Sequence, residues 1–401
     1  MGPPPGAAAD RRPDRLELAD IFRTDGARYR QTHVLARVQR AAMRAIEACR
    51  TALLGGHRET CDRCGATRLA YNSCRNRHCP KCQTLTKERW LAARRADLLP
   101  IPYFHVVFTL PHALNALAQG NPRVLYTLLF RAAADTLLTF GRDPRHLGGT
   151  IGMTAILHTW GQNLSQHLHL HCLVTGGALS ADRSRWIAGR ASLLFPVQAR
   201  STVFRAKYLE ALRHAFDTGQ LLFAGGTADL ADRVAFTNFV ARLKAIDWIV
   251  YAKRPFAGPE QVLEYLGRYT HRVALSNDRL VEHGNGRVRF RWKDYADHDR
   301  VKILTLEADE FIRRFLLHIL PSRFVRIRHF GLLANRTRPR QVARARQLLG
   351  APPVEPARPE SVFVLMQRLT GIDFSRCPLC GDGRMQRTAF APTWLPSPDT
   401  S

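Results

Sequence analysis

The segment from residue 167 to residue 174, HLHLHCLV, constrains the fold of this chain most strongly, because polar and apolar residues alternate in it. A period of two is typical of a β-strand, whose successive side chains point to opposite faces. The leucines, the cysteine and the valine would then face a core, and His167, His169 and His171 would share the other face. The segment therefore predicts a sheet strand with one histidine-bearing face.

Two interpretations of the histidine face remain open. Residues of one face follow each other at about 7 Å along a strand, so one metal ion takes two neighbouring histidines and not all three. A third ligand must then come from elsewhere. His105 in YFHVVFTL is the first candidate, followed by His158, Gln162 and the remaining histidine of the strand. The alternative is a polar strand that faces solvent and carries its histidines by chance.

Cysteines form a second pattern, CDRCGATRLAYNSCRNRHCPKCQ, at residues 61–83. The pairs Cys61/Cys64 and Cys79/Cys82 each have the C-x2-C spacing, and 14 residues separate the two pairs. Such pairs present two thiolates to one ion, and two of them complete a tetrahedral zinc site. Nine cysteines in a chain that we expect to be cytoplasmic point to metal binding rather than to disulfides.

Cys74 and His78 add two further ligand types between the pairs, which is more than one structural zinc ion needs. Either they displace part of the simple set or they help to form a second site. Cys377 and Cys380, in CPLCGDG, make a third C-x2-C pair that would supply the missing half of such a site.

The charge of the chain indicates its partner. A net charge of +27, with 60 basic residues against 33 acidic ones, favours a polyanion such as nucleic acid. A GC-rich genome would explain arginine in place of lysine, but not this excess. No apolar run approaches the roughly 18 residues of a membrane helix, and the first residues do not resemble a signal peptide. Basic residues close to the cysteines are candidate DNA contacts: Arg75, Arg77 and Lys81.

A predicted helix carries two tyrosines in the sequence EYLGRYTHR. Tyr265 and Tyr269 are four residues apart and so share one helical face. An aromatic pair at the edge of a core is the simpler interpretation of this spacing. The neighbouring basic residues Arg268 and Arg272 favour a site that binds phosphate. In such a site a metal ion would polarise the phosphodiester, and an activated tyrosine hydroxyl would attack it.

Helical and extended patterns are mixed along the chain, which predicts an α+β fold. Strands are expected at YFHVVFTL, TAILHTW, HLHLHCLV, RVALSN, RVRFRW and VKILTL. Pro100 and Pro102 mark a plausible domain boundary. We expect a disordered N-terminus at 1–15, a helical zinc-binding domain at 16–100, a catalytic domain with a central antiparallel sheet at 101–336, and a basic, proline-rich tail at 337–401.

Taken in order, these motifs resemble one known family. The chain resembles the rolling-circle transposases of the insertion-sequence IS91 family. The segments that carry the resemblance are SCRNRHCPKCQ, FHVVFTLPH, WGQ followed by HLHLHCLVTGG, YLGRYTHRVALSN and FIRRFLLHILPSRFVRIRHFGLLAN. These enzymes belong to the two-tyrosine HUH class, named for its histidine–hydrophobe–histidine motif. The resemblance covers about residues 20 to 385.

The resemblance implies roles for particular residues. His169 and His171 would bind a catalytic Mg²⁺ or Mn²⁺, with His167 the least certain member of the set. Tyr265 and Tyr269 would attack single-stranded DNA at the ends of the element and form 5′-phosphotyrosine links. The N-terminal domain with its structural Zn²⁺ would help to recognise those ends.

Three other functions compete with this one. A replication initiator or relaxase shares the chemistry but has no reason to carry the zinc cluster, and no Walker motif for an accompanying helicase is present. A non-enzymatic zinc-ribbon protein would bind DNA without cutting it. A phosphodiesterase that uses water as the nucleophile would cut DNA without a covalent intermediate.

Overall fold

The computed structural model describes residues 15–189, 195–256, 261, 262, 265, 267, 270, 271, 273–353 and 360–392. Helices and antiparallel sheets share this part of the chain, so the predicted α+β class is confirmed.

The largest sheet has six strands in the order β11-β4-β5-β3-β7, with a short β6 paired to β5. Every pairing in it is antiparallel. The HLHLHCLV segment lies in β5, between β4 and β3, as the alternation predicted. The strand bounds are β3 (Tyr103–Thr109), β4 (Gly149–Trp160), β5 (Gln166–Ser180), β6 (Trp186–Ala188), β7 (Val250–Phe256) and β11 (Ile327–Gly331).

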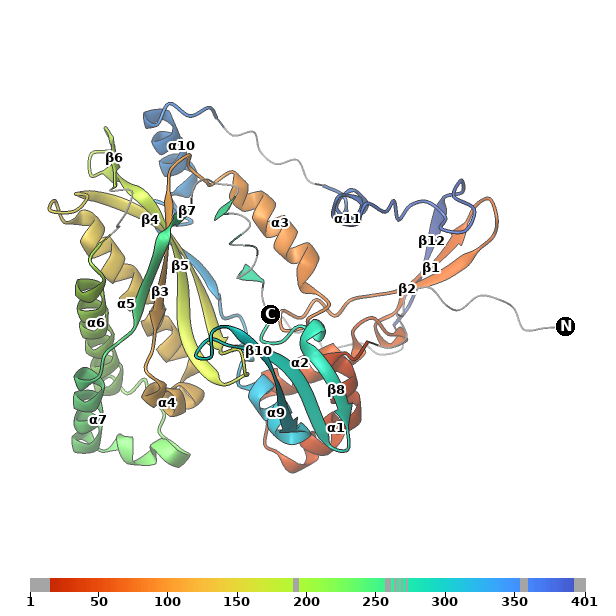
Figure 1. The fold of residues 1–401 in the computed structure, drawn as a ribbon, viewed down its shortest axis with the longest axis horizontal. Coiled ribbons are helices and arrows are strands. Elements are labelled where there is room, and N and C mark those ends of the chain that lie inside the picture. Colours follow the sequence, from red (N-terminus) through yellow and green to blue (C-terminus); the bar gives the residue numbers. More distant parts are fainter. Residues whose placement is uncertain are drawn as a thin grey trace.

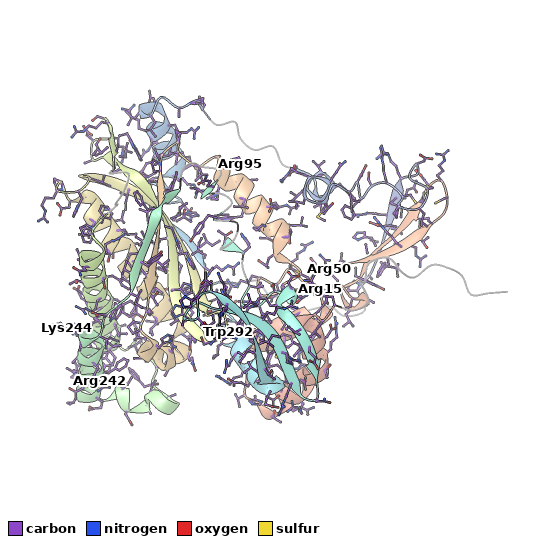
Figure 2. All side chains as sticks on the ribbon, in the orientation of Figure 1. Arg15, Arg50, Arg95, Arg242, Lys244 and Trp292 are labelled. Atoms are coloured by element: carbon purple, nitrogen blue, oxygen red, sulfur yellow. The ribbon has the colours of Figure 1, made fainter. Side chains whose placement is uncertain are left out.

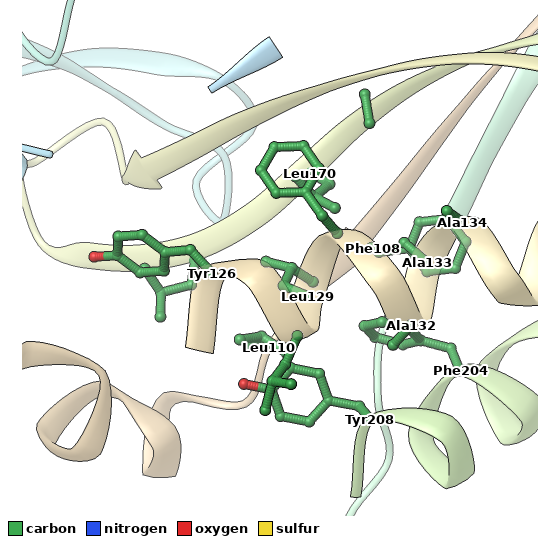
Figure 3. Packing of buried hydrophobic residues seen from close by; sticks show 14 of the residues in the cluster. Phe108, Leu110, Tyr126, Leu129, Ala132, Ala133, Ala134, Leu170, Phe204 and Tyr208 are labelled. Atoms are coloured by element: carbon green, nitrogen blue, oxygen red, sulfur yellow. The ribbon is translucent and has the colours of Figure 1, made fainter. Parts of the chain in front are cut away.

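One face of this sheet carries the largest hydrophobic core. Leu168 and Leu170 of β5 and Phe108 of β3 pack against α5 (Pro122–Arg142) and α6 (Val197–Asp217), with Phe204 and Tyr208 on α6 (Figure 3). α7 (Arg233–Ala245) extends this layer, and Figure 1 shows these helices together on one side of the sheet. α5 is long and apolar enough to cross a membrane, with a mean hydropathy of 1.2, but 67% of that window is buried inside the protein.

The opposite face of the sheet carries the histidines. A smaller core there joins Tyr103, Ile156 and Leu173 of the sheet to α3 (Gln83–Arg95), Val262 and α10 (Arg338–Leu348). α3 runs along this side of the sheet in Figure 1. Consecutive residues of β5 thus alternate between the largest hydrophobic core and the face that carries the histidines.

A second core brings the beginning of the chain to residues far along it. α1 (Leu18–Thr32) and α2 (Arg37–Ala48) pack on a three-stranded sheet and on α9 (Ala308–Leu316). This sheet has the order β10-β9-β8, with β8 (Leu280–Gly284), β9 (Arg287–Asp294) and β10 (Arg300–Glu307). The contacts cross the boundary that we expected near residue 100.

RVALSN was wrongly predicted as a strand, because residues 273–276 form a loop and residue 277 begins a short 3-10 helix. Ala274 and Leu275 are neighbours that are both buried in the second core, and consecutive burial does not suit a strand with one exposed face. RVRFRW and VKILTL are strands β9 and β10, as predicted.

A third sheet, which we call the end sheet, joins the last described strand to two strands from the N-terminal part of the chain, in the order β12-β1-β2. β12 (Met385–Phe390) pairs antiparallel with β1 (Gly56–Cys61), and β2 (Thr67–Tyr71) lies on the other side of β1. Figure 1 shows this sheet away from the central one, close to α11 (Val362–Thr370). The remaining short helices are η1 (Ala52–Leu54), η2 (His112–Leu114), α4 (Asn115–Gly120), η3 (Gly225–Ala231) and η4 (Asn277–Arg279).

Candidate active site and metal centres

Three histidines from two adjacent strands bring their ring nitrogens together. His158 of β4 lies directly opposite His169 of β5, and His171 follows on the same face. One ring nitrogen of each lies within 4.8 Å of the others. The Nε2 atoms of His169 and His171 are 3.1 Å apart. Two nitrogens bound at about 2.1 Å to one ion stand at a similar separation, about 3 Å.

The hydrogen bonds of these rings fit a metal. Nδ1 of His169 lies 2.9 Å from the carbonyl oxygen of His167, and because a carbonyl only accepts, Nδ1 donates and the lone pair lies on Nε2. If His171 likewise donates from Nδ1, which lies 3.0 Å from Nε2 of His105, its Nε2 lone pair faces that of His169. Two lone pairs at 3.1 Å repel each other unless a cation lies between them. The donor set therefore suits a divalent ion, and the Nδ1 bonds orient the ligands.

His105 lies behind this group and not within it. It is 2% exposed on β3, where its register partner on β5 is Leu173, two residues beyond His171. Its Nε2 is 3.0 Å from Nδ1 of His171 and 2.6 Å from the hydroxyl of Tyr265. Strand register places His158, the second candidate for the third ligand, beside the pair, and His105, the first candidate, behind it.

His167 is also outside the group. Its ring lies beside that of His112, with centroids 5.4 Å apart, at the end of β5 that leads away from His171. Burial and the neighbouring His112 lower its pKa. The strand geometry that limits one ion to two neighbouring histidines agrees with this placement.

Tyr265 is the described member of the tyrosine pair. Its hydroxyl contacts His105, which in turn contacts His171, so His105 lies between Tyr265 and the three-histidine group. Tyr269, Arg268 and Arg272 lie outside the described residues. His271, from the same segment, packs against Trp90 of α3, and its pKa is lowered to about 4, mainly by burial and further by Arg326 and Lys87.

Four cysteines form a first sulfur group, Cys49, Cys74, Cys79 and Cys82, with all Sγ atoms within 4.8 Å of one another. Cys49 follows α2 directly, and Cys82 directly precedes α3. Hydrogen bonds from the other three thiols, that of Cys49 first, lower the pKa of Cys82. Sequence reasoning missed Cys49, because it stands alone without a C-x2-C partner, and only the packing of α2 brings it here.

A second sulfur group consists of Cys61, Cys64, Cys377 and Cys380, again within 4.8 Å. From their spacing we expected the pairs Cys61/Cys64 and Cys79/Cys82 to bind one ion together, but the structure places them in different sulfur groups. The reason is that β1 and β2 form a hairpin that carries the first pair towards the C-terminal segment. The third C-x2-C pair completes this group, in line with the alternative left open above.

His78 belongs to neither sulfur group. Its Nε2 accepts a hydrogen bond from the backbone N–H of Leu320 at 3.4 Å. Of the basic residues expected to contact DNA, Arg77 donates to the carbonyls of Phe324 and Pro321, and Lys81 pairs with Glu17 at 2.6 Å. Arg75 is exposed. Arg77 and Lys81 thus make contacts within the protein.

Comparisons with protein families give two matches. Residues 152–341 match a family described as "Putative transposase", of the two-tyrosine type, and residues 21–110 match a "Transposase zinc-binding domain" of IS91 type. The first match includes all three histidines of the group and Tyr265. The second includes the first sulfur group and half of the second one.

Two curated proteins are similar over most of their length. The "Putative transposase y4qJ" of Sinorhizobium fredii is 54% identical over 92% of this chain and 94% of its own. The transposase for insertion sequence element IS801 of Pseudomonas savastanoi is 29% identical over 85% of this chain and 81% of its own.

Among solved structures, the conjugative relaxase TrwC in complex with oriT DNA gives a match with 16% identity and a TM-score of 0.22, over 62% of this chain and 73% of that one. A complex of TrwC with mutant oriT DNA has a TM-score of 0.25 and covers 80% of this chain and 99% of that one. A likeness this weak carries no functional information by itself.

Proposed function

The chain belongs to the IS91 family of transposases, and we propose that it cuts and rejoins single-stranded DNA at the ends of a mobile element through 5′-phosphotyrosine intermediates. Tyr265 and Tyr269 are the proposed nucleophiles. The supporting observation is the position of the Tyr265 hydroxyl, 2.6 Å from His105, which itself contacts the three-histidine group.

The first step follows from this position. The Tyr265 oxygen attacks the phosphorus, the bond from phosphorus to the 3′ oxygen breaks, and the proton of the hydroxyl ends on the departing 3′ oxygen. The hydrogen bond between this hydroxyl and Nε2 of His105 fixes the position of the tyrosine oxygen and aims it at a phosphate beside the histidines. The covalent link preserves the energy of the phosphodiester, so a 3′-OH reverses the step on a new strand without ATP.

His158, His169 and His171 are the residues that would hold a divalent ion. When bound, the ion supplies positive charge to a non-bridging phosphate oxygen. The candidate ions remain Mg²⁺ and Mn²⁺, of which Mg²⁺ prefers oxygen ligands and gives up its bound water reluctantly. His105 and the His167 carbonyl keep two of the rings in place through their Nδ1 atoms.

The second tyrosine and the neighbouring bases complete the proposal. Tyr269 would hold one strand while Tyr265 holds another, so that donor and target are joined within one protein. Arg268 and Arg272 would bind the DNA backbone next to the tyrosines.

DNA is the partner that the charge favours. The net charge is +27, and Figure 2 labels basic side chains on well-separated elements: Arg50 after α2, Arg95 at the end of α3, and Arg242 and Lys244 on α7. Exposed Arg75 next to the first sulfur group is the remaining candidate from that region. Tyr295 is 63% exposed and suited to stack on a base, whereas Phe290 is buried in the second core.

The experiment detects the covalent intermediate. The protein is incubated with labelled single-stranded end DNA and Mn²⁺, and adducts are resolved on a denaturing gel. We expect an adduct that shifts the protein band and that both Tyr265→Phe and Tyr269→Phe alter. Tyr71→Phe removes a hydroxyl from the end sheet and should leave the adduct unchanged.

Each alternative function predicts a different result. Cleavage without an adduct would identify water as the nucleophile, and binding without cleavage would identify a non-enzymatic DNA-binding protein. Full strand transfer by Tyr269→Phe would contradict the use of two nucleophiles.

A further inference from the structure

We infer that Cys61, Cys64, Cys377 and Cys380 bind a second structural zinc ion, which joins the N-terminal and C-terminal parts of the chain. The matched zinc-binding domain ends at residue 110 and so contains only half of these ligands. Cys64 and Cys377 are 313 positions apart in the sequence, and their Sγ atoms are in contact in this group.

The sulfur positions have the geometry of a zinc–thiolate site. Sγ of Cys61 is 3.7 Å from that of Cys380, and Sγ of Cys64 is 3.7 Å from that of Cys377. Four sulfurs at about 2.3 Å from a zinc ion stand about 3.8 Å apart along each edge of a tetrahedron. A disulfide would bring two sulfurs to about 2.05 Å, and all four cysteines are free.

The two C-x2-C pairs form the same turn. Each is followed by a glycine with positive φ, Gly65 at 70° and Gly381 at 73°. In each, the N–H of that glycine donates to the carbonyl of the first cysteine, at 3.1 Å and 3.0 Å. The two halves of the site are therefore equivalent, although they come from opposite ends of the sequence.

Backbone donors point at the sulfurs in both halves. The N–H of Cys64 lies 3.4 Å from Sγ of Cys61, and the N–H of Gly383 lies 3.3 Å from Sγ of Cys380. Donors of this kind stabilise thiolate over thiol. A Cβ on Gly383 would stand 2.2 Å from Sγ of Cys61, so this position must be glycine for the two halves to close.

The end sheet needs such an ion because it has no hydrophobic core. Among the described residues, none from β1, β2 or β12 belongs to any of the three core clusters. Four of the six β12 residues are exposed. A small sheet without apolar burial is stable only with a cross-link, and in a reduced chain a metal ion provides it.

Cobalt titration of the reduced protein, stripped of metal, tests the inference. Co²⁺ bound to thiolates gives a charge-transfer absorption that Co²⁺ on histidines does not give, so the three-histidine group does not contribute. We expect two thiolate-bound equivalents in the native chain and one in Cys377→Ser/Cys380→Ser. Cys172→Ala, which changes the one cysteine outside both sulfur groups, should retain two.

A native-chain measurement covers the possibility that the double variant does not fold. Zinc-loaded protein is treated with a thiol-alkylating reagent, and protection at each cysteine is read by mass spectrometry before and after chelation. Cys61, Cys64, Cys377 and Cys380 should be protected together and released together. One cobalt equivalent in the native chain, or alkylation of Cys377 and Cys380 while Cys61 and Cys64 stay protected, would overturn the inference. Neither readout depends on DNA cleavage.

Discussion

Each imidazole near the candidate active site has a role that depends on which strand carries it. His158 and His169 are register partners on adjacent strands, so their rings meet across the sheet. His105 is paired with Leu173, and its Nε2 contacts Nδ1 of His171, while Nε2 of His171 faces His169. A shift of either strand by one register position would remove its histidine from this site, because it would move that side chain to the other face of the sheet.

The first prediction concerns His158. His158→Ala should raise the Mn²⁺ concentration needed for half-maximal adduct formation by tenfold or more, because it removes one of the three proposed ligands. His167→Ala should change this concentration by less than twofold, since the His167 ring lies outside the three-histidine group and the hydrogen bond to Nδ1 of His169 comes from the backbone carbonyl, which the substitution keeps. The measurement is a metal titration of the adduct assay, and equal effects of the two variants would contradict the assignment.

The second prediction concerns pH and His318. This residue is 2% exposed, its Nε2 lies 3.1 Å from the carbonyl oxygen of Leu164, and burial lowers its pKa to about 4. The unfolded chain has a histidine pKa of about 6.5 and binds the proton more tightly, so protonation favours unfolding. The contribution of neutral His318 to the free energy of unfolding is complete above about pH 6.5. It is lost as the pH falls towards 4, and the total loss is about 3 kcal/mol.

Urea unfolding at pH 7.5 and pH 5 measures this effect. His318→Gln should reduce the loss of unfolding free energy between the two pH values by about 2 kcal/mol, and its amide can still donate to Leu164. His214→Gln, at an exposed position on α6, is the matched control. An unchanged pH dependence in His318→Gln would show that this histidine does not titrate as stated.

At the scale of the elements, α9 shows how a helix links distant segments. Its apolar side carries Phe311 and Phe315, both buried, and Phe315 packs edge-to-face on Phe22 of α1 at 5.5 Å. Phe311 packs on Phe290 of β9 at 5.8 Å. The helix thus connects the small sheet to the N-terminal helices.

The third prediction follows from this packing. Phe311→Ala should lower the unfolding free energy by about 3–5 kcal/mol, because it opens a cavity in the second core. Arg313→Ala on the same helix should cost about 0–1 kcal/mol, since Arg313 makes a partly exposed ion pair with Glu310. Chemical denaturation compares the two, and similar losses would contradict the role of the second core.

At the scale of the whole molecule, segments that are far apart in the sequence pack together. α1 and α2 supply Phe22, Met43 and Ile46 to the second core, and Cys49, directly after α2, belongs to the first sulfur group. These contacts cross the boundary that we expected near residue 100 and link the N-terminal range to the range that follows it.

The fourth prediction tests this dependence. A fragment of residues 101–353 lacks α1 and α2, so it should expose the apolar side of α9 and bind a hydrophobic dye without a cooperative thermal transition. Residues 15–353 retain the second core and the first sulfur group, and should unfold cooperatively with one zinc ion. A cooperative transition of the shorter fragment at the temperature of the longer one would contradict this account.

Short-range patterns in the sequence determined the elements and the kinds of chemistry. Alternation in HLHLHCLV predicted a strand with a core face and a histidine face, and C-x2-C spacing predicted zinc, because both patterns involve neighbouring residues. RVALSN was misjudged where tertiary burial outweighed the local pattern.

Only the tertiary structure decided which motifs meet. Strand register places His158 and not His105 beside His169. The packing of α2 brings Cys49 to Cys82, and the pairing of β1 with β12 brings Cys61 to Cys380. The physical reason is that a metal site needs ligands within a few ångströms in space, and chain spacing limits this distance only for residues a few positions apart.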